Sequence, residues 1–269
     1  METAAILFDL DDTLVVDEAA GEAALLATCV EPQKRYGLEP HALARTVRQC
    51  ARELWRAAPT FAYCCAIGLG SVEGLWARFL GNDPQVQTLQ AWAPTYRRQA
   101  WANALAAYGV RDTHLAEQLA EAFQAERRAR HRTYPEVDAV LRELQSRYRL
   151  AVVTNGTPDL QREKLEAVGL VPYFTSVTVS GALGSGKPDP RIFAHTLARL
   201  GVPPTQAVMV GNDLTRDIRG ARQAGIAGIW VNRTGTASAA GDTAPDAEIA
   251  SLLELLQMYR GLPAMLNNE

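Results

Sequence analysis

Residues 6–13 read ILFDLDDT, a short apolar stretch that runs directly into acidic residues. Its length and composition predict a buried β-strand over 6–10. Four later stretches have the same character, at 150–154, 176–179, 207–211 and 228–231, and helical patterns lie between most of them, at 137–147, 158–168, 191–200 and 218–224. Strands that alternate with helices predict an α/β fold, a doubly wound parallel sheet with helices on both faces.

The segment between the first two strands differs from the rest in composition. Eleven of the 19 aromatic residues lie between positions 36 and 123. Residues with high helix propensity recur there at spacings of three and four, which predicts an all-α bundle with helices at 19–36, 41–57, 71–80, 86–108 and 115–132. The uncharged stretch 59–70 favours a buried helical segment, with a flexible loop as the alternative. We therefore expect one domain from residues 1–16 and 134–269, and an inserted domain from 17–133.

The overall composition excludes several classes of protein. Lys and Arg number 27 against 30 Asp and Glu, for a net charge of −3, so no basic excess indicates nucleic acid as a partner. The apolar runs are too short to cross a membrane, and the first residues lack the pattern of a secretory signal. Cys29, Cys50, Cys64 and Cys65 have no metal-site spacing. These features predict a cytoplasmic protein, and they do not indicate its oligomeric state.

Polar residues follow the predicted strands at the points where these strands end. Because ligands of open parallel sheets bind beyond the carboxyl ends of the strands, we expect these side chains to lie together. They include three carboxylates, a hydroxyl, an amide and a lysine: Asp9, Asp11, Thr154, Asn155, Lys187 and Asp213. Carboxylate oxygens attract Mg²⁺, which commonly joins a protein to a substrate phosphate. A lysine and a hydroxyl suit the charge and lone pairs of a phosphoryl group. The pattern predicts phosphoryl transfer.

The order and spacing of four segments resemble the motifs of the haloacid dehalogenase-like hydrolase superfamily. They are residues 9–13 (DLDDT), Thr154, residues 187–190 (KPDP), and residues 211–213 (GND) with Asp217. The helical insertion resembles the C1 class of cap domain in that family. The resemblance covers most of the chain. It implies a Rossmann-like catalytic core, a helical cap that determines substrate specificity, and a phosphatase-type member.

The resemblance also implies roles for single residues. Asp9 corresponds to the nucleophile, which forms an aspartyl-phosphate intermediate. Asp11 corresponds to the acid that protonates the leaving oxygen and later deprotonates the attacking water. Thr154 and Asn155 would hydrogen-bond the phosphoryl oxygens, and Lys187 would neutralise their charge and that of Asp9.

A magnesium ion would be held by the Asp9 carboxylate, the Asp11 carbonyl and Asp213. Many relatives carry an acid directly after the glycine of the fourth motif, whereas this sequence has Asn212 there and the acid one place later. Asn212 could still offer its amide oxygen, but the sequence favours Asp213 as the ligand. Asp217 is expected to orient Lys187 rather than to contact the metal.

The function that the resemblance implies is a Mg²⁺-dependent phosphatase that hydrolyses a small phosphomonoester, with a small phosphorylated metabolite as its partner. Three alternatives stay open at this point. A phosphosugar mutase carries the same pair of aspartates, and a 2-haloacid dehalogenase shares the superfamily without needing the second one. A non-catalytic protein could use the same fold to bind a partner.

Overall fold

The chain, seen here in a computed structural model, is described over residues 3–236 and 244–259. It forms two compact units. The first comprises Met1–Val16, Arg132–Asn155 and Gln161–Glu269, and the second comprises Asp17–His131 and Gly156–Leu160. The short segment 156–160 lies just after Thr154 and Asn155 in the sequence, but it groups with the helical unit. The sequence did not predict this assignment.

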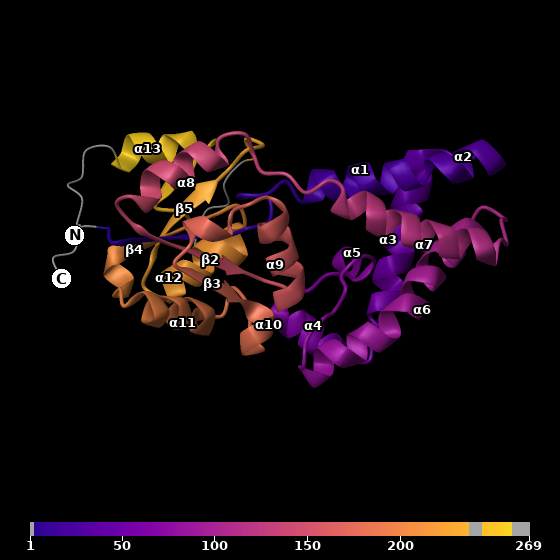
Figure 1. Ribbon diagram of the computed structural model, residues 1–269, viewed down its shortest axis with the longest axis horizontal. Coiled ribbons are helices and arrows are strands. Elements are labelled where there is room, and N and C mark those ends of the chain that lie inside the picture. The colour runs from indigo at the N-terminus through magenta and orange to yellow at the C-terminus, as the bar shows by residue number, and fades with distance from the viewer. Residues whose placement is uncertain (1–2, 237–243, 260–269) are drawn as a thin grey trace. The chain divides into compact units, whose positions relative to one another are not determined.

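The first unit is built on a parallel sheet (Figure 1). Within the described residues it has six strands in the order β3-β2-β1-β4-β5-β6, and every neighbouring pair is parallel. The strands are β1 (Ala5–Phe8), β2 (Arg149–Thr154), β3 (Ser176–Val179), β4 (Ala207–Gly211), β5 (Ala227–Val231) and β6 (Ala247–Ile249). The predicted α/β sheet is confirmed. The sequence missed β6, because three residues with an exposed glutamate in the middle carry no strand signal.

Alternate residues of the strands face opposite sides of the sheet. Ile6 and Phe8 of β1 pack in a cluster with α8 (Val137–Gln145) and α13 (Leu253–Tyr259). Leu7 packs in a second cluster with α11 (Pro190–Leu200) and α12 (Gly220–Gln223). Figure 1 shows these two pairs of helices on opposite faces of the sheet, with α9 (Pro158–Ala167) and α10 (Ser180–Leu183) as further helices of the chain.

The strand order fixes where a ligand can bind in this unit. From β1 the chain continues outward through β2 and β3 on one side, and then through β4, β5 and β6 on the other. The direction of winding therefore reverses next to β1, and such a switch point leaves a crevice at the carboxyl ends of the central strands. Asp9 follows β1 at this edge and Asn212 follows β4.

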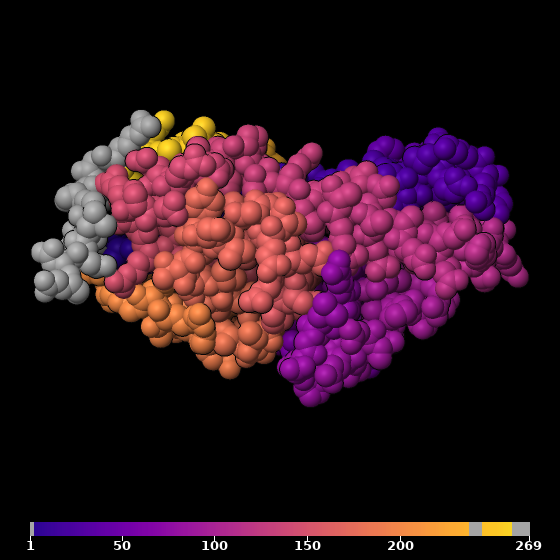
Figure 2. Space-filling model, viewed as in Figure 1, coloured from indigo at the N-terminus to yellow at the C-terminus, as the bar shows by residue number. Residues whose placement is uncertain are grey.

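The second unit is helical, as predicted. Its helices are α1 (Glu18–Thr28), α2 (Val30–Tyr36), α3 (Pro40–Trp55), α4 (Phe61–Ile67), α5 (Ser71–Gly74), α6 (Pro84–Ala106) and α7 (Thr113–Arg128). The uncharged stretch 59–70 contains α4, which agrees with the predicted helix, but only Cys64 and Ile67 of this helix are buried, so the expected burial is wrong for most of it. The helices α6 and α7 pack against each other, and both reach the face of this unit that is visible in Figure 2. A single apolar cluster that includes Trp76 and Trp101 forms the core.

Two predicted helices of this unit were wrong in extent. The helix expected over 19–36 is divided at Cys29, because Pro32 cannot donate to the carbonyl of residue 28 and its ring crowds that carbonyl. The helix expected over 71–80 ends after one turn. Two arginine side chains bind carbonyls at its end and just beyond it: Arg97 donates to Gly74 O at 3.1 Å, and Arg128 donates to Trp76 O at 2.5 Å.

No helix within the described residues is both long and apolar enough to cross a membrane. The small, polar stretch 235–245, which the sequence suggests is a mobile loop, lies mostly outside the described residues.

Candidate active site

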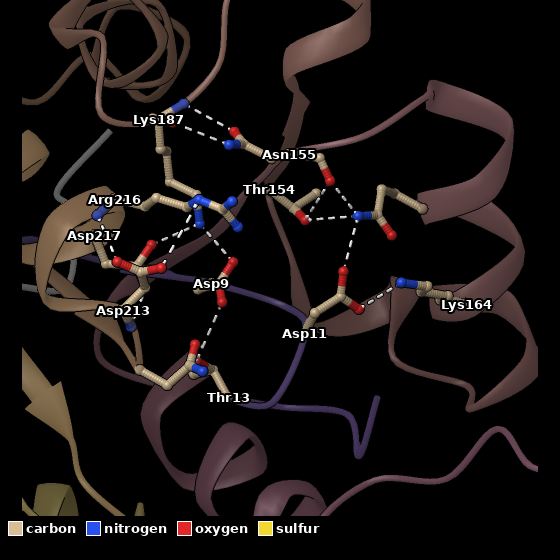
Figure 3. Close-up of polar contacts among 12 residues, drawn as sticks. Asp9, Asp11, Thr13, Thr154, Asn155, Lys164, Lys187, Asp213, Arg216 and Asp217 are labelled. Carbon is tan, nitrogen blue, oxygen red and sulfur yellow. Dashed lines mark hydrogen bonds and ion pairs between the residues drawn. The ribbon is translucent and has the colours of Figure 1, made fainter. Parts of the chain in front are cut away.

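Asp9 directly follows β1, and its side chain is almost fully buried. Its N–H donates to Val210 O at 2.9 Å, which continues the ladder between β1 and β4 beyond the strand. Oδ1 accepts from Lys187 Nζ at 2.5 Å, and Oδ2 accepts from Thr13 Oγ1 at 3.3 Å (Figure 3). Burial raises the pKa of Asp9 to about 6, because the Lys187 ammonium offsets only part of that effect and the Asp217 carboxylate adds to it.

Lys187 lies in the connection between β3 and α11, and only a small part of it reaches solvent. Its ammonium is shared between Asp9 Oδ1 at 2.5 Å and Asp217 Oδ1 at 2.7 Å. Burial alone would lower the pKa of Lys187, but the carboxylates of Asp217 and Asp9 raise it above its usual value. The lysine is therefore held as a cation beside Asp9.

Asp217 lies in the π-helical turn Leu214–Arg219, and it is completely buried. Besides its ion pair with Lys187, its Oδ2 accepts from Asp213 N at 2.9 Å. Gly211 makes room for this carboxylate, since a Cβ at that position would lie 2.2 Å from Asp217 Oδ2. The contact expected between Asp217 and Lys187 is thus present, and it depends on a glycine at the end of β4.

Asp213 and Asn212, which follow β4, have different surroundings. Asp213 Oδ1 accepts from the backbone N–H groups of Thr215 and Arg216, both at 2.8 Å, so this carboxylate caps the turn that follows it. The Asn212 amide, in contrast, faces Asp9: with its nitrogen on that side, it donates to Asp9 Oδ2 at 3.1 Å and to Asp11 O at 3.2 Å. The sequence favoured Asp213 over Asn212 as a metal ligand, and this stays a prediction. In the structure the Asp213 carboxylate faces its own helical turn, whereas the Asn212 amide faces Asp9.

Thr154 ends β2 and Asn155 follows it, at the same edge of the sheet. Thr154 is buried, and its Oγ1 accepts from Gln161 Nε2 at 3.1 Å. The Asn155 side chain joins two loops, since its Oδ1 accepts from Lys187 N at 2.8 Å and its Nδ2 donates to Lys187 O at 3.0 Å. A Cβ on Gly186 would lie 2.5 Å from Asn155 Oδ1. In this structure the Asn155 side chain therefore fixes the backbone of Lys187, a contact that the sequence did not predict.

Asp11 is the more exposed of the two carboxylates after β1, with a quarter of its side chain accessible to solvent. Oδ1 accepts from Lys164 Nζ at 2.7 Å, and Oδ2 accepts from Gln161 Nε2 at 3.0 Å. In Figure 3 the Asp11 carboxylate points toward Lys164, whereas the Asp9 carboxylate points toward Lys187. The two acids therefore have different cationic partners.

Gln161 and Lys164 are site residues that sequence reasoning missed. They are three positions apart on α9, so they share one face of the helix. Leu160 and Leu165, next to them, are buried. A usable signal was therefore present, because two polar residues lie within the apolar stripe of a helix that begins shortly after Thr154.

The polar groups at the end of β1 and β4 could hold a metal ion only with a mixed set of donors. Within residues 3–236 and 244–259, no three His, Cys, Asp or Glu side chains are clustered for metal binding. The Asp9 carboxylate, the Asp11 carbonyl and the Asn212 amide are nevertheless close together. Oxygen donors of this kind suit a hard divalent cation rather than zinc or copper.

Comparison with known proteins identifies relatives along nearly the whole chain. The chain is 41% identical to a phosphoserine phosphatase from Thermus thermophilus over 251 residues, which cover 93% of this chain and 96% of the relative. It is 30% identical to a glyceraldehyde 3-phosphate phosphatase from Methanopyrus kandleri over 265 residues, or 96% of this chain and 97% of the relative.

A solved structure supports the fold. The crystal structure of the HAD-hydrolase YfnB from Bacillus subtilis matches with a TM-score of 0.67 and 23% identity, and covers 96% of this chain and 99% of that one. The sequence pattern of the haloacid dehalogenase-like hydrolases matches residues 3–225. Together with the site at the end of β1, these matches place the chain in a family: it belongs to the haloacid dehalogenase-like hydrolases.

Proposed function

We propose that this protein is a phosphatase that hydrolyses a small phosphomonoester through an aspartyl-phosphate on Asp9. The observation that carries the proposal is the buried Asp9 carboxylate at the switch point of the sheet, 2.5 Å from the ammonium of Lys187. A buried carboxylate beside a fixed cation can attack phosphorus while the cation neutralises the phosphoryl oxygens. The phosphatases from Thermus thermophilus and Methanopyrus kandleri support this reading, because both align with almost the whole chain.

Two steps follow from these residues. In the first, an Asp9 oxygen forms a bond to phosphorus, the bond from phosphorus to the leaving oxygen breaks, and Asp11 gives that oxygen a proton. In the second, Asp11 takes a proton from water as the water oxygen bonds to phosphorus, and the bond to Asp9 breaks. Inorganic phosphate then leaves, and the Asp9 carboxylate is regenerated. Acid–base assistance of this kind contributes about 10²–10⁴ in rate.

The donor set around Asp9 fits Mg²⁺. The side of the Asn212 amide that faces Asp9 lies 3.1 Å from Asp9 Oδ2 and 3.2 Å from Asp11 O. Its nitrogen donates to both oxygens when no ion is present, and the opposite orientation of the amide places Oδ1 there. Neighbouring ligand oxygens of an octahedral Mg²⁺ are separated by about 3 Å, since each lies roughly 2.1 Å from the metal. We propose that Asp9 Oδ2, Asp11 O and Asn212 Oδ1 hold the ion, with Asn212 in place of Asp213. When bound, the ion screens the negative nucleophile from the negative phosphate.

The two domains would divide the work. We propose that residues 1–16 and 134–269 carry out the reaction, and that the helical domain 17–133 determines which phosphomonoester is accepted. The enzyme would act on a phosphorylated metabolite in the cytoplasm.

The decisive experiment combines a panel of substrates with one variant. Phosphate release is measured with Mg²⁺ on phosphoserine, glyceraldehyde 3-phosphate, sugar phosphates and nucleotides. Asp9→Asn should lower turnover of every substrate by at least about 10⁴-fold, because the amide is a poor nucleophile. The wild-type enzyme, quenched in acid during turnover, should carry a phosphoryl group on the peptide that contains Asp9. Retention of more than a few per cent of activity by Asp9→Asn, or conversion of one sugar phosphate to its isomer without free phosphate, would contradict the proposal.

A further inference from the structure

A second buried lysine of the first unit, Lys164, contacts Asp11 but has no part in the two proposed steps. Lys164 is completely buried on α9, and its Nζ lies 2.7 Å from Asp11 Oδ1. A buried ammonium costs free energy unless it is paired and hydrogen-bonded, and the contact with Asp11 offsets this cost. The same contact fixes one oxygen of Asp11.

The other oxygen of Asp11 is fixed by a buried amide. Gln161 Nε2 donates to Asp11 Oδ2 at 3.0 Å and to Thr154 Oγ1 at 3.1 Å, and it also donates to Asn155 O. Rotation of this amide by 180° would turn its oxygen toward the Asp11 carboxylate, so the electrostatics allow one orientation only. Gln161 therefore connects Asp11 to Thr154, the residue proposed to bind the phosphoryl group.

The contacts with Lys164 and Gln161 restrict the rotation of the Asp11 side chain, which its backbone position alone would not do. A side chain that is a quarter exposed has room to rotate, and rotation about χ2 of an aspartate is easy. Each Asp11 oxygen instead meets a donor from the same face of α9. The carboxylate plane is thus set by a helix that begins next to the phosphate-binding segment, and not by the strand that carries Asp11.

We propose that Lys164 and Gln161 are positioning residues that hold the Asp11 carboxylate in the orientation needed to transfer a proton to and from the reacting oxygen. The inference rests on the proposed phosphatase function. Neither residue touches the substrate, and both act through Asp11. Misplacement of a proton donor matters most for a poor leaving group, since a good one departs without a proton.

The test uses Lys164→Met, which keeps the length of the side chain and removes the donor. Turnover is measured on an alkyl phosphate and on p-nitrophenyl phosphate, whose leaving group needs little protonation. We expect kcat to fall by about 10- to 100-fold for the alkyl phosphate and by less than about threefold for the aryl phosphate. Gln161→Leu should shift the ratio in the same direction, and it is the second variant if Lys164→Met does not fold.

Two controls separate positioning from a structural role. Arg162→Met removes a positive charge from an exposed position of the same helix and should leave both rates unchanged. In the background of Asp11→Asn, Lys164→Met should add less than about threefold to the loss, because residues that act as a unit are non-additive.

The outcomes are distinguishable. Equal losses on both substrates, or a full additional loss in the Asp11→Asn background, would overturn the positioning role while Asp9→Asn still behaves as proposed. If Asp9→Asn keeps its activity, the phosphatase mechanism itself fails, and the role of Lys164 fails with it.

Discussion

Asp9 and Asp11, which follow β1, each face a buried lysine, but the two pairs are built differently. Lys187 comes from a loop and is shared between Asp9 and Asp217, with its backbone fixed by the Asn155 side chain. Lys164 comes from a helix face and binds Asp11, a carboxylate that is a quarter exposed. The difference suggests separate tasks. Under the proposed mechanism, the first pair would hold charge next to the reacting phosphorus, whereas the second would fix the direction of a group that exchanges protons.

The largest difference between the pairs should appear in stability. Lys187→Met leaves Asp9 and Asp217 buried without their cation, which should lower the free energy of unfolding by about 3–5 kcal/mol. Lys164→Met should cost about 1–3 kcal/mol, because Asp11 can be solvated in part. Urea unfolding of both variants measures the two losses. An equal cost for the two lysines would contradict the difference between the two pairs, and adding Asp217→Asn to Lys187→Met should recover part of the larger loss.

A smaller change should disturb the Lys187 pair alone. In Gly211→Ala the new Cβ would lie 2.2 Å from Asp217 Oδ2, so the carboxylate must move away from its place beside Lys187. We expect a loss of about 1–3 kcal/mol, which is typical of overpacking, and a fall in kcat on every substrate alike. Thermal unfolding and the aryl-to-alkyl ratio are the measurements. A change in that ratio would show that the two pairs are coupled rather than separate.

The dependence of activity on Mg²⁺ should distinguish the roles of the neighbouring residues Asn212 and Asp213. Asn212→Ala should raise the Mg²⁺ concentration needed for half-maximal activity by about tenfold or more, because the amide lies beside Asp9 Oδ2 and Asp11 O. Asp213→Ala should leave that concentration nearly unchanged and cost about 1 kcal/mol of stability, since it removes a cap. Titration of activity with Mg²⁺ checks both. The reverse pattern would restore Asp213 as the ligand.

The smallest expected effect lies in the helical domain and provides a reference for the glycine variant. Gly21 is in α1, and a Cβ there would meet its nearest neighbour, Arg127 Nε, at 4.0 Å. Gly21→Ala should therefore raise the free energy of unfolding by about 0.5–1 kcal/mol, because alanine has the higher helix propensity and fits the available space. Its kcat should equal that of the wild type. A loss of stability here would mean that the space in α1 is smaller than the contact suggests.

Much of the catalytic unit could be predicted from short segments of the chain. Five of the six described strands lie within one residue or two of their predicted bounds, because buried parallel strands form short, continuous apolar runs. Asp9 and Lys187 were predicted to lie at one edge and are in contact. The helices were predicted less well. Pro32 divides the helix expected over 19–36, and the helix expected over 71–80 ends at Gly74, whose carbonyl accepts from Arg97.

The sequence by itself determined which acids follow the strands, since strand and turn patterns are local. Only the tertiary structure decided the partner of each acid. Whether Asn212 or Asp213 turns toward Asp9 depends on the helical turn that Asp213 caps, and the contact of Lys164 with Asp11 spans 153 positions of sequence. Such pairings arise from the packing of α9 and β4 beside β1. No periodicity encodes them, because a buried polar group takes whichever partner the fold brings within hydrogen-bonding distance.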